Sequence, residues 1–95
     1  SLLYPKFDFF AGLLDSKNNF LQWGGIHVIA NLATMDSKNR IERIFDKYFA
    51  PIAGPVLITA ANVINGAAKI ALAKPKLVER ITTELLKVEK ARYQT

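Results

Sequence analysis

Few side chains in this sequence could perform catalysis or hold a metal ion. The chain has one histidine, His27, and no cysteine, which excludes disulfides and cysteine-based zinc or redox sites. Catalysis by a serine nucleophile needs a histidine in contact with it and an acid that orients the histidine. Ser1, Ser16 and Ser37 stand at the terminus or in polar turn segments, and the carboxylates are scattered. The sequence therefore predicts no catalytic centre, no metal site and no cofactor, so we expect the protein not to be an enzyme.

One set of polar residues does follow a helical pattern. His27 and Asn31 are four residues apart, Asn65 and Lys69 repeat this spacing further along the chain, and Asn62 precedes Asn65 by three residues, so each set shares one helix face. A shift of 38 residues carries His27 onto Asn65 and Asn31 onto Lys69. We expect these pairs to lie side by side on one exposed surface that binds a protein partner. The alternative is that the surface is polar only because water covers it.

The elements that must position these residues are helices. Apolar residues recur at spacings of three and four, and no segment alternates with a period of two, which predicts an all-α protein. Pro5, Pro55 and Pro75 each stand where the first turn of a helix is expected. We predict about five antiparallel helices, near 5–14, 19–34, 37–50, 55–73 and 75–93.

The predicted helices alternate in character. The third is amphipathic, whereas the second and fourth are apolar around most of their circumference and must be buried on several sides. Within the second helix, Gly24 and Gly25 indicate a close approach by a neighbouring helix, and we expect Trp23 to pack between helices. The apolar stripe of the third helix consists of Ile41, Ile44, Phe45, Tyr48, Phe49 and Ile52.

Comparison of the chain with itself indicates an internal repeat. A shift of 38 residues aligns the first two helices with the next two, and a shift of 37 aligns the third helix with the fifth. The sequence thus predicts copies at about 5–34 and 37–73, followed by a half-repeat helix at 75–93. Aligned pairs include Phe7 with Phe45, Ile26 with Ile64, Ala30 with Ala68, Ile41 with Val78 and Tyr48 with Leu85.

The segment 13–33 resembles a HEAT repeat. It has the paired apolar end of a first helix, a turn aspartate and a second helix rich in small residues, at positions Leu13, Leu14, Asp15, Gly24, Gly25, Ala30, Leu32 and Ala33. The chain departs from that family where Gln22 and Ala60 replace a frequent arginine, and where Gly54–Pro55 replaces the turn aspartate in the second copy. The resemblance implies an α–α superhelix, or armadillo-like solenoid, whose second helices line the concave surface.

The function that we expect is protein binding or scaffolding. Residues 1–95 form a single helical-repeat domain, expected to be a fragment of a longer cytoplasmic solenoid. Its ends carry aromatic and apolar residues such as Phe9 and Leu86, which further repeats or a second subunit would cover. The alternative is a nucleic-acid-binding repeat resembling DNA glycosylases of HEAT fold. The net charge of +5 is compatible with that alternative, but only Lys69 is positively charged on the predicted surface. We expect no membrane span, because Gly54–Pro55 and polar residues interrupt the long uncharged segment.

Overall fold

Helices joined by short turns account for most of the computed structural model, which describes residues 3–93. Within this range no β-strand forms, so the all-α prediction is confirmed. Five short 3-10 segments lie between or beside the α-helices: η1 (Tyr4–Lys6), η2 (Ala33–Met35), η3 (Ala50–Ala53), η4 (Pro75–Leu77) and η5 (Lys87–Lys90). The α-helices are α1 (Phe7–Leu13), α2 (Asn19–Asn31), α3 (Arg40–Arg43), α4 (Phe45–Phe49), α5 (Leu57–Ala73) and α6 (Val78–Leu86).

The single helix predicted near 37–50 is wrong, because the segment divides into α3, α4 and η3. The Asp36 carboxylate accepts hydrogen bonds from the backbone N–H groups of Arg40 and Ile41, at 2.8 Å each, so α3 begins only at Arg40. Asn39 just before it has a left-handed φ of 56°, and Ile44 leaves helical geometry with φ −107° and ψ 14°. The apolar stripe still reaches the core, since 3-10 turns preserve a spacing of about three residues.

Other predicted boundaries also shift. Helix α5 begins at Leu57 rather than at Pro55, because Val56 is extended and Gly54 has a φ of 103°, which glycine adopts without steric cost. Helix α6 is framed by η4 and η5, and the chain becomes extended at Ala91 instead of remaining helical to 93. Helix α2 likewise gives way to η2.

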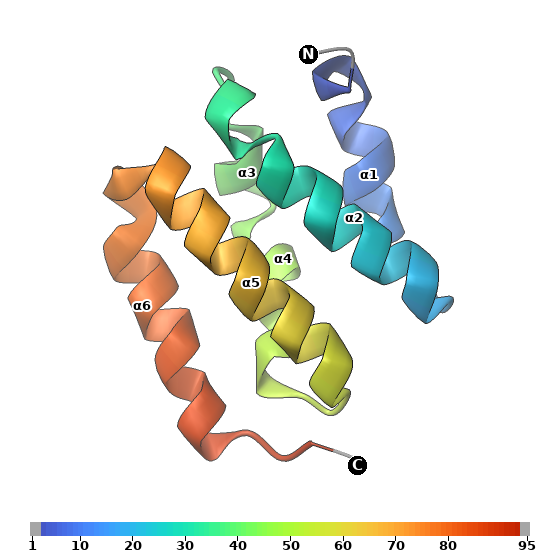
Figure 1. The fold of residues 1–95 in the computed structure, drawn as a ribbon, viewed down its shortest axis with the longest axis vertical. Coiled ribbons are helices and arrows are strands. Elements are labelled where there is room, and N and C mark those ends of the chain that lie inside the picture. The colour runs from blue at the N-terminus through green and yellow to red at the C-terminus, as the bar shows by residue number, and fades with distance from the viewer. Residues whose placement is uncertain (1–2, 94–95) are drawn as a thin grey trace.

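Two layers of helices make up the molecule. In Figure 1, α2 and α5 lie side by side in front and run in the same direction, while α1, α3 and α4 lie behind them and α6 flanks α5. The extents of 37 × 30 × 17 Å match two helical layers, because packed helix axes are separated by about 8–10 Å. The repeat shift places the second predicted helix beside the fourth, and α2 and α5 do lie next to one another and run in the same direction.

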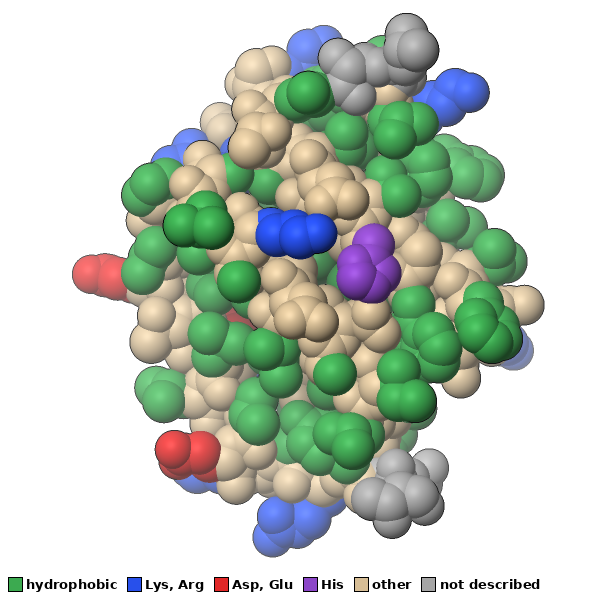
Figure 2. Space-filling model, in the orientation of Figure 1, with side chains coloured by type: hydrophobic (Ala, Val, Ile, Leu, Met, Phe, Trp, Pro, Cys, Tyr) green, Lys and Arg blue, Asp and Glu red, His purple; other side chains and the backbone are tan. Residues whose placement is uncertain are grey.

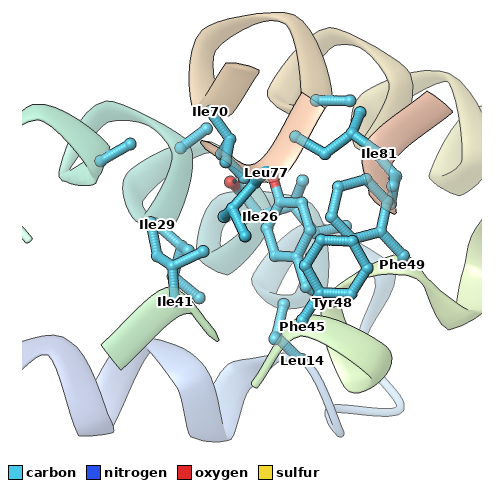
Figure 3. Packing of buried hydrophobic residues seen from close by; sticks show 14 of the residues in the cluster. Leu14, Ile26, Ile29, Ile41, Phe45, Tyr48, Phe49, Ile70, Leu77 and Ile81 are labelled. Carbon is cyan, nitrogen blue, oxygen red and sulfur yellow. Dashed lines mark hydrogen bonds between the residues drawn. The ribbon is translucent and has the colours of Figure 1, made fainter. Parts of the chain in front are cut away.

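The core lies between these layers, around Tyr48 (Figure 3). The Tyr48 ring packs against Phe49 with ring centroids 5.2 Å apart, and its hydroxyl donates to the Ile26 carbonyl at 3.0 Å. Burial raises the pKa of Tyr48. Gly66 of α5 lies against the same hydroxyl, where a Cβ atom would collide with it. A back-layer side chain therefore reaches both front helices, which fixes the distance between the layers.

Gly25 and Trp23 are the residues through which α2 contacts α1 and α5 closely. A Cβ atom on Gly25 would lie 2.9 Å from the Phe10 carbonyl oxygen of α1, whereas one on Gly24 would meet nothing within 4 Å. The expected close approach therefore concerns Gly25 alone. On the other side of α2, the half-buried Trp23 donates its Nε1–H to Thr59 Oγ1 of α5 at 2.7 Å, in line with the packing role expected for it.

Candidate partner-binding face

The five predicted site residues come from α2 and α5, and the structure brings four of them together in two pairs. Lys69 Nζ donates to Asn31 Oδ1 at 2.9 Å, so the expected proximity of these two residues is confirmed. His27 Nε2 lies 2.6 Å from Asn62 Oδ1, so the expected pairing of His27 with Asn65 is wrong. Asn62 is half-buried and the other four are exposed.

Helix geometry explains why His27 binds Asn62 and not Asn65, the residue that the shift of 38 predicted. Asn62 and Lys69 are seven residues apart, so both lie along the edge of α5 that faces α2, whereas Asn65 lies about 60° further round the helix. The Asn62 amide also donates to the Ile58 carbonyl at 2.9 Å, which directs its oxygen towards His27. Because that oxygen only accepts, His27 Nε2 carries the proton in this contact.

The outer surface of α2 and α5, which we name the α2/α5 face, carries very little charge. Neither helix contains an acidic residue, and Lys69 is their only lysine or arginine. Phe20, Ile58 and Leu72 are large apolar side chains exposed on these helices. Figure 2 shows this face, with the histidine and one basic side chain near its middle and hydrophobic side chains around them. Depletion of charge with exposed aromatic and aliphatic groups is typical of the centre of a protein interface.

The apolar ends expected from the sequence are also present. Phe9 on α1 and Leu86 on α6 are both well exposed. Phe7, by contrast, is buried in the core, and Tyr93 is half-buried and donates its hydroxyl to the Ile52 carbonyl at 2.6 Å.

A buried ionic cluster was not predicted from the sequence. Lys74 Nζ, which follows α5, lies 3.0 Å from Asp36 Oδ2 and 2.8 Å from Glu42 Oε1. The Tyr4 hydroxyl also donates to Asp36, at 2.6 Å. Asp36 and Lys74 are 38 residues apart, which is the repeat shift, so opposite charges at equivalent turns were the signal that could have revealed the pair.

In this cluster, the hydrogen bonds together shift the pKa values further than burial does, and in the opposite direction. Burial by itself raises the pKa of the Asp36 carboxyl, but donors from Tyr4, Ile41, Arg40 and Lys74 hold that pKa below its ordinary value. Burial likewise disfavours the Lys74 ammonium, yet its bonds to Glu42 and Asp36 raise the Lys74 pKa. Both groups are thus charged at neutral pH and bound to each other.

An open pocket of about 470 Å³ lies beside the cluster, between the turns that follow α2 and α5. The charged groups on its wall already have partners, since Asp36 and Lys74 bind each other and Lys76 binds Glu42 at 3.1 Å. Among residues 3–93 there is also no group of three side chains that could hold a metal ion. We therefore interpret the cluster as a clamp between two turns.

These features define an all-α protein of two helical layers with a weakly charged outer face. Comparisons with protein-family models, with curated proteins and with solved structures gave no significant match. In the described part of the chain, no helix is both long enough and apolar enough to cross a membrane.

Proposed function

We propose that this chain is a protein-binding or scaffolding segment of a HEAT- or armadillo-like solenoid and contacts its partner through the α2/α5 face. The repeat hypothesis is supported by contacts between equivalent positions. Asn31 binds Lys69 and Asp36 binds Lys74, and each pair spans 38 residues. Stacked repeats place equivalent residues next to one another in this way.

The observation that carries the binding proposal is the chemical character of the α2/α5 face. Phe20 and Leu72 project from opposite ends of the face with most of their surface exposed. Between them lie polar groups that can donate and accept hydrogen bonds. Such a surface gains free energy from apolar burial on binding and has almost no charge to desolvate.

The nucleic-acid alternative receives little support from the same face. Binding to phosphates relies on several lysine or arginine side chains and weakens steeply as salt increases. Lys69 is the one basic residue that α2 and α5 provide, and Asn31 already binds it. Binding through this face should therefore depend only weakly on salt.

Site-specific photo-crosslinking tests the proposal. A photoreactive phenylalanine analogue at position 20 or 72 should crosslink a discrete protein from a cell extract, with similar yield from 50 to 300 mM salt. The same analogue at position 9 serves as the control, because Phe9 lies on α1 and is 65% exposed, against 80% for Phe20 and 85% for Leu72. Substituting both Asn31 and Lys69 by alanine should lower the yield at positions 20 and 72. Crosslinks that are indifferent to position, or that go mainly to nucleic acid and disappear with salt, would contradict the proposal.

A further inference from the structure

The edge of α5 that faces away from α2 exposes residues whose repeat equivalents are buried. Ile26 of α2 is fully buried, whereas its equivalent Ile64 is 37% exposed. Tyr48 is fully buried, whereas its equivalent Leu85 of α6 is 36% exposed. Ala68 is exposed as well, although Ala30 is buried. The second copy therefore leaves open an edge that the first copy covers.

In the first copy, the corresponding edge belongs to α2, and α5 covers it. Gly66 lies against the Tyr48 hydroxyl, and a Cβ atom at this glycine would be 3.4 Å from the Ala30 Cβ atom. The buried side of α5 consists of small or aliphatic uncharged residues: Thr59, Ala60, Val63, Gly66, Ala67 and Ile70. The molecule thus shows which kind of helix covers such an edge.

A polar contact accompanies this covering. His27 on the edge of α2 binds Asn62 of the covering helix α5. The repeat equivalent of His27 is Asn65, which is exposed and forms no side-chain hydrogen bond within residues 3–93. Asn65 therefore stands where a residue of a covering helix would bind.

We propose that Ile64, Asn65, Ala68, Leu85 and Leu86, named here the open edge, form a docking site for one α-helix of a partner polypeptide. This helix runs parallel to α5, as α5 runs parallel to α2, and presents an uncharged face of small residues with a side-chain amide opposite Asn65. The inference rests on the repeat hypothesis above and concerns a surface that adjoins the α2/α5 face and shares Asn65 with it.

The chain itself supplies the probe for this site. A fluorescent peptide with the sequence of residues 57–73 and two added lysines at each end should bind the full chain saturably, as measured by fluorescence anisotropy. Leu86→Glu should weaken binding at least tenfold, because docking would bury an unpaired charge. Asn65→Ala should weaken it about two- to tenfold, the usual effect of one lost hydrogen bond. A peptide with leucine at the position of Gly66 should not bind.

Phe9→Glu is the matched control for Leu86→Glu. The two side chains are 65% and 61% exposed, so neither change should alter the fold, and unchanged circular dichroism and Tm verify this. Equal losses with Leu86→Glu and Phe9→Glu, or no saturable binding, overturn the proposal.

Two further results would also overturn the proposal, because they would show that the peptide binds elsewhere or that a different occupant covers the open edge. Displacement of the chain's own α5 would change the fluorescence of Trp23, which contacts Thr59. A dimer that dissociates on Leu86→Glu would show that a second copy occupies the open edge. If the peptide binds but no crosslinks form at positions 20 and 72, the proposed function of the α2/α5 face is refuted and the docking site on the open edge is not.

Discussion

Asp36→Ala should lower the free energy of unfolding by about 3 kcal/mol at pH 7. The change removes two backbone caps of α3, and a lost cap usually costs about 0.5–2 kcal/mol. It also leaves the buried Lys74 ammonium with Glu42 as its one carboxylate partner within residues 3–93. Removing one member of a buried pair typically costs about 3–5 kcal/mol, and the remaining bond to Glu42 places the expected value at the lower end.

The effect of Lys74→Met should be smaller, about 1–2 kcal/mol, because each carboxylate keeps other donors. Asp36 keeps the Tyr4 hydroxyl and its backbone donors, and Glu42 keeps Lys76 at 3.1 Å. The double variant should therefore cost less than the sum of the single variants by about 1 kcal/mol or more.

Urea unfolding measures these differences against a total stability of about 5–14 kcal/mol for 95 residues. Trp23 is the chain's one tryptophan, so its fluorescence reports on the contact between α2 and α5, and far-ultraviolet circular dichroism reports on the helices. A cost below about 1 kcal/mol for Asp36→Ala, or strictly additive single variants, would refute the argument that this cluster clamps the two turns.

The pH dependence gives an independent check. The folded-state pKa of Asp36 lies below its ordinary value of 3.8, so the ionised form stabilises the fold at any pH above that value. This stabilisation is lost as pH falls through the lower, folded-state pKa. The difference in stability between wild type and Asp36→Ala should thus be constant from about pH 5 to 8 and shrink below about pH 4. A difference that grows on acidification would contradict the assigned direction.

The glycines give further predictions, each measurable by the same urea unfolding. Gly24→Ala should stabilise the fold by about 0.5–1 kcal/mol, because the site is open and helical, whereas Gly25→Ala should destabilise it by about 1–3 kcal/mol through contact with the Phe10 carbonyl; equal effects would show that the α1–α2 approach is not tight. Gly66→Ala should cost about 2–3 kcal/mol through overpacking against the Tyr48 hydroxyl. Tyr48→Phe in the same chain should recover at least 1 kcal/mol relative to additivity, and a purely additive double variant would argue against that collision.

The sequence was most informative about which residues are buried and least informative about where helices begin. The stripe containing Ile41, Phe45 and Tyr48 is buried as predicted, because α-helical and 3-10 turns both return an apolar residue to the core after three or four positions. Because both kinds of turn keep this spacing, the apolar pattern does not reveal that the helix is interrupted at Ile44. The start at Arg40 depends on side-chain hydrogen bonds from Asp36, which hydrophobic periodicity does not encode.

The candidate site was predictable to within about one helical turn. The shift of 38 residues correctly joined Asn31 with Lys69, since both lie on the facing edges of their helices. It failed for His27, because Asn65 points further outward than Asn62 does. A repeat places equivalent positions on neighbouring helices, but the rotation of each helix about its own axis decides which side chains come into contact.

The contacts between Asp36 and Lys74 and between Asn31 and Lys69 constrain how such a chain could arise by duplication. Under the proposed repeat, each contact joins a residue to its counterpart one unit later, so identical units would place the same side chain against itself. Tandem copies of the first unit would set one buried carboxylate against another, and copies of the second would oppose two ammonium groups, both of which are unfavourable. The two proposed units must therefore differ at these turns, and exchanging their order along the chain would break the contact. The ion pair between Asp36 and Lys74 thus distinguishes the proposed unit that comes first along the chain from the unit that follows it.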